Sequence, residues 1–341
     1  MDLDFKKAEQ ALDNLSFSER LKSIGNLVKH TFTIIGKDED IIKPWIRMLI
    51  YNLIMVSGLF YAWLGWWYDL PLEGWSLFLA IALFFYKYFY YNKQEVRLSH
   101  IVYETIIGND PSFTSAVAAC KPIQSQTRKI AWIDIGMAFV GKAKQQSGGG
   151  FLMTLIRFFI NGVEEVWDLI NHYLLPSVAV DHLDITPAVK KMKKLKDQVP
   201  ESLVGVFGID FLGSVTRKIV LPIYFGLGIV SIALGIYLAG SLPSTVIQGA
   251  EVPTDYWFET LQFSWIPVII ALWMGKLFSS VIERTVTGIK VIYFTIFYTK
   301  ITHPDRIMDS LQEELVDYLK LEEVDEVENL DEQGVEAPSP A

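Results

Sequence analysis

Two stripes of polar residues hold the side chains best suited to chemistry in this sequence. The first lies in residues 151–175, a predicted helix of membrane-spanning length whose polar positions fall within an arc of about 120° at ~100° per residue. Its members are Arg157, Asn161, Glu164, Glu165, Asp168, Asn171 and His172. Because each charge at the centre of a bilayer costs at least ~2.5 kcal/mol, we expect this stripe to avoid lipid. Three placements do so: the membrane interface, a cytoplasmic helical bundle, or the wall of a water-filled space.

The second stripe lies in residues 276–290, where polar side chains recur at helical spacing after an apolar stretch. Two interpretations are open. The stripe can face the first one in a salt-bridged helix pair, or it can line a charged vestibule or pore. From the two stripes we predict the residues that line a pore or hold an assembly together: Arg157, Asn161, Glu164, Glu165, Asp168, His172, Lys276, Glu283, Arg284 and Lys290.

Metal binding and lipid binding are the other chemistries that the residue types suggest. Glu164, Asp168 and His172, with Asp181 and Asp184 nearby, offer oxygen and nitrogen ligands, but their spacing lacks the Glu-x-x-His pair of di-iron bundles, so we expect no metal site. A basic cluster follows, which either contacts anionic headgroups or is a solvated face that enforces topology. The headgroup residues are Lys190, Lys191, Lys193, Lys194 and Lys196.

Signatures of common enzyme classes are missing from the sequence. It has no Walker loop, no dinucleotide-binding glycine fingerprint, no Gly-x-Ser-x-Gly elbow and no His-Glu-x-x-His pair. A single cysteine, Cys120, excludes a disulfide framework. The net charge of −9 argues against nucleic acid as a partner. We therefore predict a protein that is not an enzyme and needs no cofactor.

The composition predicts an all-α membrane protein that positions these stripes. Charged residues are 20% of the chain, below the quarter or so that is usual for soluble proteins. Four apolar stretches are long enough to cross a bilayer, the last one continuing as a partly polar helix to about residue 298. They are residues 48–67, 75–91, 219–239 and 263–278, and Lys87 is expected to reach the headgroups from the second.

The distribution of Lys and Arg predicts the orientation. The connections at 68–74 and 240–257 contain neither residue, whereas residues 93–218 contain fifteen. Since positive residues gather on the cytoplasmic side, we expect a multi-pass protein of the cell membrane with both termini in the cytoplasm.

Five regions follow from this reading. An amphipathic helix opens the chain and lies either in the membrane interface or against the protein's own cytoplasmic part. The regions are an N-terminal helix at 1–43, a first transmembrane hairpin at 44–92, a cytoplasmic or interfacial helical segment at 93–217, a second hairpin with its helical extension at 218–300, and an acidic helix and tail at 301–341.

Several short motifs carry a resemblance to a known family. They include Phe-Ser-Glu-Arg-Leu-Lys at 17–22, Gly-Asn-Asp-Pro-Ser at 108–112, Leu-Leu-Pro-Ser-Val-Ala-Val at 174–180 and Ile-Tyr-Phe-Thr-Ile-Phe-Tyr at 292–298. In these motifs the chain resembles a family of bacterial and archaeal polytopic membrane proteins and, more distantly, the choline-transporter-like proteins. The resemblance implies a helical membrane protein with roughly six membrane-associated helices and no established catalytic residues. The chain departs from that pattern in the charges of residues 151–175 and in Asp181, where Glu is usual.

The leading functional prediction is a homo-oligomeric, channel-like assembly whose charged helix faces line an aqueous vestibule, because four spans of one copy cannot easily enclose a pore. Two alternatives remain. One is a non-conducting scaffold that binds partner proteins, and the other is a transporter of lipids or small solutes, for which no inverted repeat is apparent. The expected partners are membrane lipids, further copies of the chain, and a cytoplasmic protein bound by the acidic tail.

Overall fold

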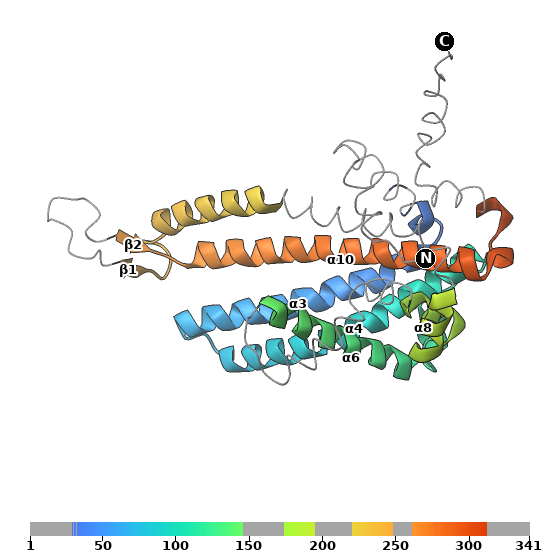
Figure 1. Ribbon diagram of the computed structural model, residues 1–341. Helices are drawn as coiled ribbons and strands as arrows, with labels where there is room; N and C mark the ends of the chain where they lie inside the picture. Colours follow the sequence, from blue (N-terminus) through green and yellow to red (C-terminus); the bar gives the residue numbers. More distant parts are fainter. Residues whose placement is uncertain are drawn as a thin grey trace, which may run out of the picture.

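The computed structural model describes residues 33–145, 174–194, 220–247 and 261–311, together with Lys29 and Thr31. Within these residues the chain is predominantly helical (Figure 1). The elements in chain order are η1 (Glu39–Ile41), α3 (Ile42–Tyr68), α4 (Glu73–Ile106), α5 (Phe113–Ala119), α6 (Gln124–Gln145), α8 (Ile185–Lys194), β1 (Thr245–Ile247), β2 (Leu261–Phe263), α10 (Ile266–Thr302) and η3 (Pro304–Arg306). Two further helical segments are residues 174–181 and Val220–Tyr237.

Three helices among the described residues are long and apolar enough to cross a membrane: Glu39–Tyr68, Val220–Tyr237 and Ile266–Thr302. The first contains the predicted span 48–67, and the other two overlap most of the predicted spans 219–239 and 263–278, so a multi-pass helical membrane protein fits the structure. The prediction of four clear spans is not confirmed, because α4, which contains residues 75–91, is not among these helices. Tyr and Lys residues at 86–91 make this stretch less apolar than its length suggests.

A short turn joins α3 and α4 into an antiparallel hairpin. Asp69 and Leu72 both adopt positive φ, at 51° and 65°, which reverses the chain in four residues. The helices then pack closely, since Ser76 Oγ donates to the Gly58 carbonyl at 2.6 Å. A Cβ at Gly65 would lie 2.4 Å from the Glu73 Cβ, so only glycine permits this approach.

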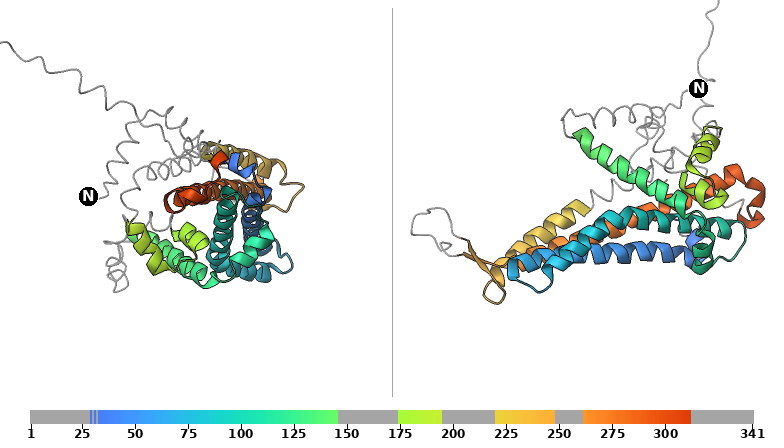
Figure 2. Two further views of the ribbon diagram at one scale, coloured as in Figure 1. Left: turned by 90° about the vertical axis from the view of Figure 1, so that its right-hand side faces the viewer. Right: turned by 90° about the horizontal axis from the view of Figure 1, so that it is seen from below.

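Helix α10 runs alongside this hairpin for most of its length (Figures 1 and 2). It joins α3 through Trp273 Nε1, which donates to Ser57 Oγ at 3.1 Å. Val220–Tyr237 lies beside the first half of α10, the half next to the β-ribbon, which we call the outer half. There Tyr224 donates to the Gly275 carbonyl. The glycines of Val220–Tyr237 differ in how closely other residues approach them. Gly235 lies against the Phe263 ring, whereas Gly226 and Gly228 have no described neighbour within 4 Å of an added Cβ.

A two-stranded ribbon connects these last two helices, which modifies the all-α prediction. Strands β1 and β2 are antiparallel, with Thr245 opposite Phe263 and Ile247 opposite Leu261. The β-branched run Thr245–Ile247 favours the extended conformation, so the described part of this connection forms paired strands.

The buried core lies at the end of the molecule opposite the α3–α4 turn and the β-ribbon. It gathers the second halves of α4 and α10 with α5, α6, residues 174–181 and α8. Inside it, Ser99 and Thr295 share a hydrogen bond of 2.7 Å between their hydroxyls. Its large apolar side chains include Ile101, Ile106, Ile130, Leu174, Ile292, Tyr293 and Phe297.

The other end of the molecule has the reverse pattern, because its large apolar side chains are exposed. They line the outer surfaces of α3, α4, Val220–Tyr237 and α10, and include Trp66, Phe78, Phe225, Ile229, Ile270 and Phe278. Surfaces this apolar are typical of helices that face lipid.

Candidate functional site

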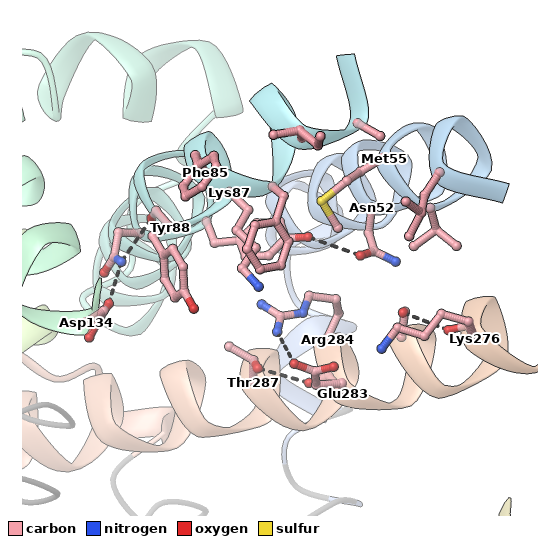
Figure 3. Close-up of a pocket in the computed structure, with 18 of the residues that line it drawn as sticks. Asn52, Met55, Phe85, Lys87, Tyr88, Asp134, Lys276, Glu283, Arg284 and Thr287 are labelled. Atoms are coloured by element: carbon pink, nitrogen blue, oxygen red, sulfur yellow. Dashed lines mark hydrogen bonds and ion pairs between the residues drawn. The ribbon is translucent and has the colours of Figure 1, made fainter. Parts of the chain in front are cut away.

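A cavity of about 790 Å³ lies where the exposed and buried ends of the molecule meet (Figure 3). Helices α3, α4 and α10 form its walls, and Asp134 of α6 closes one end. The wall toward the α3–α4 turn is apolar, with Leu59, Phe60 and Phe84. The wall toward the core is polar and charged, and includes Lys87, Tyr88, Asn92, Glu95, Asp134, Glu283, Arg284 and Thr287, whereas Lys276 lines the cavity nearer the start of α10.

The α10 side of the cavity is the second predicted stripe. Helical spacing brings Lys276, Ser280, Glu283, Arg284 and Thr287 to the cavity, whereas Lys290 and Ser279 do not line it. The Arg284 guanidinium donates to Glu283 Oε1 at 2.6 Å and lies 4.4 Å from the centre of the Tyr91 ring. The stripe therefore faces α3 and α4 across a space large enough for water or a small solute.

The α4 side contributes a polar face that follows directly on the apolar stretch. Tyr88, Tyr91, Asn92 and Glu95 recur at i, i+3, i+4 and i+7, so they share one side of the helix. Asn92 Nδ2 donates to Asp134 Oδ2 at 2.6 Å, which ties α4 to α6 at the cavity end.

Lys87 lies one turn before this face and also lines the cavity. Its ammonium lies 4.2 Å from the centre of the Phe84 ring and 4.8 Å from that of Tyr88. In Figure 3 Lys87 of α4 and Arg284 of α10 extend into the same space, with Lys276 further along α10. The sequence analysis expected Lys87 at the headgroups, but its side chain also belongs to this cavity.

Two carboxyl groups of the cavity have pKa values near neutrality. Burial raises the pKa of Asp134 to about 6, against the opposing effect of the Asn92 hydrogen bond. Burial also raises the pKa of Glu95 to about 7, with Arg284 acting to lower it and Asp134 to raise it. Both residues lie beyond the apolar stretch of α4 and can exchange protons in the physiological range.

The cavity thus holds three cations and three acids, of which two acids titrate near pH 7. Protonation of Glu95 and Asp134 makes the cavity more positive. Such a site can hold water and an ion, and its preference for cations or anions should depend on pH.

A second cluster centres on Asp181 at the end of residues 174–181. Its Oδ2 accepts from Tyr298 and Lys191, and its Oδ1 lies 2.7 Å from His303 Nε2. Burial acts to raise the pKa of Asp181, but the hydrogen bonds from Lys191, Tyr298 and His303 hold it below its ordinary value. This cluster joins α8 to the end of α10 and serves packing.

The lysines predicted to contact lipid headgroups differ in their surroundings in the structure. Lys191 is engaged by Asp181, whereas Lys190 is exposed. The side chains of Lys193 and Lys194 are not among those described, and Lys196 lies outside the described residues. Asp184, weighed as a metal ligand, pairs with Lys129 at 2.8 Å. Within the described ranges no group of three or more His, Cys, Asp or Glu residues could hold a metal ion.

The first predicted stripe cannot be placed. Its predicted members lie outside the residues that the structure describes: Arg157, Asn161, Glu164, Glu165, Asp168, Asn171 and His172. Their pairing with the α10 stripe therefore stays a prediction, as do the three placements of residues 151–175.

Glu95 and Asp134 are the site residues that the sequence analysis missed. A signal existed for each. Glu95 completes the i, i+3, i+4, i+7 polar face of α4, and Asp134 is the single charge within the apolar residues 130–140. Their convergence from two helices required the tertiary structure.

Comparison with known protein families, curated proteins and solved structures finds no match to this chain. The cavity geometry therefore carries the functional argument, and the family resemblance stays a prediction.

Proposed function

We propose that this is a multi-pass protein of the cell membrane with four spans and both termini in the cytoplasm. Three spans are the long apolar helices, and the fourth is the first half of α4. The turn after Tyr68 is four residues long, so if α3 crosses the membrane, α4 must return through the same thickness. Exposed apolar residues outside the cavity, such as Phe78 and Leu79, support lipid contact along this part of α4.

We further propose that the cavity is the cytoplasmic vestibule of a channel-like homo-oligomer that conducts small ions. The observation that carries this proposal is the convergence of Glu95, Asp134 and Arg284 on one cavity between spanning helices. Leu59, at the apolar end of the cavity, is about 16 Å along α3 from Met48, roughly half of a ~30 Å hydrocarbon layer. Charged groups beside such a layer are typical of ion pathways.

Conductance recording from the purified protein in planar bilayers tests this proposal. We expect ion currents whose cation preference falls as the pH drops from about 8 to 5, because Glu95 and Asp134 become neutral. The double variant Glu95→Gln, Asp134→Asn should lower cation preference at pH 8 and remove most of its pH dependence.

Glu104→Gln is the matched control, since Glu104 lies on the opposite face of α4 from Glu95 and pairs with Asn109. It should leave selectivity unchanged. Folded protein that carries no current under any of these conditions would contradict the channel proposal and favour the scaffold alternative, in which the acidic tail binds a cytoplasmic protein.

One observation favours a carrier as the second candidate. On the outer side of the cavity, Trp273 of α10 donates to Ser57 of α3, so the two helices meet there. A carrier would open this contact only transiently and would move solute at a saturable rate. Solute flux into vesicles that saturates, in the absence of resolvable single-channel currents, would select the carrier. Trp273→Ala should raise passive leak under either mechanism.

A further inference from the structure

A cluster of cations lies on the side of α4 opposite the cavity. Lys93 and Arg97 are one turn apart on this side, whereas Tyr91, Asn92 and Glu95 face the cavity. Arg47 of α3 and Arg128 of α6 complete the set. We call Arg47, Lys93, Arg97 and Arg128 the basic cluster.

The basic cluster differs from the cavity because its positive charges are not balanced. Among the described residues, none of its four members forms an ion pair with a carboxylate. Asp40, an acid beside it, is already held by Lys43 and by the backbone N–H of Phe113. Burial lowers the pKa of Lys93, and the charges of Arg97 and Arg128 lower it further.

Arg97 is the member that points most directly to a ligand. Its side chain is only 8% exposed, yet its Nε is buried without a hydrogen-bond partner in the described structure. Its one hydrogen bond is a long one, 3.4 Å from Nη1 to Gln94 Oε1. A buried guanidinium with unused donors is costly unless an anion joins it.

The Phe113 ring positions two of the guanidinium groups. The Arg47 Cζ lies 4.2 Å and the Arg97 Cζ 5.6 Å from the centre of this ring. Stacking on an aromatic face uses the flat side of a guanidinium and leaves its N–H edge available. Two such edges suit the oxygens of a phosphate, which arginine binds through paired hydrogen bonds.

The position of the cluster identifies the source of the phosphate. Arg47 directly precedes the apolar stretch of α3, and Lys93 follows the tyrosine-rich end of that of α4, so both lie at headgroup depth. Beside Arg47, Ile46, Ile50 and Leu53 form an exposed apolar track along α3 toward the membrane interior. A free phosphate makes no favourable contact with these apolar side chains, whereas an acyl chain can lie along them.

We propose that the basic cluster binds the phosphate of one anionic phospholipid, whose acyl chain lies along Ile46, Ile50 and Leu53 of α3. Arg97 and Arg47 hold the phosphate oxygens, and Lys93 and Arg128 supply further positive charge at the rim. This site is separate from the cavity and from the lysines at 190–196, and it does not depend on whether the cavity conducts ions.

Native mass spectrometry of the full chain in neutral detergent, titrated with phosphatidylglycerol or phosphatidylcholine, tests the proposal. We expect one phosphatidylglycerol to be retained in preference to phosphatidylcholine. Arg97→Gln and Arg47→Gln should each weaken phosphatidylglycerol binding about fivefold, and their combination more strongly, since each basic group near anionic lipid contributes on that scale.

Two control variants make the result decisive. Lys121→Gln removes an exposed cation outside the basic cluster, and Lys190→Gln removes one from the lipid site predicted from the sequence; neither should change binding. If Arg97→Gln fails to fold, the exposed pair Arg47→Gln and Arg128→Gln provides the same comparison. Unchanged affinity in the Arg47, Arg97 and Arg128 variants would overturn the proposal. Displacement of the lipid by millimolar inorganic phosphate would overturn the assignment to a lipid and indicate a free-anion site.

Discussion

The outer and inner halves of α10 belong to one unbroken helix of similar apolar character but present opposite surfaces. In the outer half Ile270, Leu272 and Phe278 are exposed, whereas in the inner half Ile292 and Phe294 are buried. The inner half packs against α4 and its neighbours as the core of a water-soluble bundle would. Apolar composition alone therefore does not identify what a helix faces. The exposure of its apolar side chains separates lipid contact from protein contact.

The cavity and the basic cluster both lie between the part of the molecule with exposed apolar side chains and the buried core. They differ in whether their charges are balanced. The cavity contains acids and bases from α4, α6 and α10, so it can neutralise itself. Among the described residues the basic cluster contains only cations, so an anion from outside the chain is needed to balance its charge. Both lie near the ends of the exposed apolar surfaces of the helices, where a charge costs less than at the centre of a bilayer.

The largest effect should come from removing the same side chain in each half of α10. Ile296 is 0% exposed, so Ile296→Ala should lower the free energy of unfolding by about 2–5 kcal/mol. Ile270 is 44% exposed, and Ile270→Ala should cost less than about 1 kcal/mol, because lipid chains are as apolar as the side chain removed. Unfolding in mixed micelles, followed by tryptophan fluorescence, measures both. Equal losses would show that the outer half faces protein instead of lipid.

A smaller effect should appear in the pH dependence of stability. The pKa values of Glu95 and Asp134 are raised in the folded protein, so the native state holds these protons more tightly than the unfolded chain. Their contribution is fully present below the ordinary pKa of about 4 and is lost as the pH rises toward about 7. We expect a decline of up to roughly 3 kcal/mol for each of the two groups over this range. The variant Glu95→Gln, Asp134→Asn should flatten the profile, while Glu104→Gln should not.

The helix contacts in the outer half should respond to added methyl groups in a position-specific way. A Cβ at Gly275 would lie 2.2 Å from the Tyr224 ring, so Gly275→Ala should cost about 1–3 kcal/mol by forcing α10 away from Val220–Tyr237. Gly226→Ala meets no described atom within 4 Å and should be neutral. Thermal unfolding in detergent compares the two. A destabilising Gly226→Ala would reveal a partner surface, such as a second copy, on that face.

The helices most accurately predicted from the sequence are those with long apolar runs. Residues 48–67 and 263–278 were expected to span; α3 contains the first range and α10 contains the second from Ile266 on, and both helices have the length and apolar character of a span. The continuation of α10 beyond Phe278 was also expected and is confirmed, because no Gly-Pro or other breaker interrupts it. Prediction was weaker for α4, where the spanning stretch ended at Tyr91 but the helix continues to Ile106. Its second half faces protein, so an apolar pattern for membranes could not identify it.

The site was half predictable for a physical reason. Lys276, Glu283 and Arg284 form a stripe on one helix, and local spacing is sufficient to group them. Asp134 reaches the same cavity from a helix some forty residues after Asn92 in the chain, and only tertiary packing decides that contact. The basic cluster was missed for the same reason, since its members come from three helices and share no local pattern.

In the proposed topology the α3–α4 turn lies outside the cell and the α10–η3 junction inside, with the apolar halves of the helices in the membrane between them. Single cysteines at Gly74 and Asp305, in a Cys120→Ala background, test it most directly with a membrane-impermeant thiol reagent on intact cells. Both positions are exposed, and Gly74 has open space for the new side chain. We predict that Gly74→Cys is labelled from outside, and that Asp305→Cys is labelled only after the membrane is opened. Labelling of both positions in intact cells, or of Asp305→Cys alone, would contradict the account.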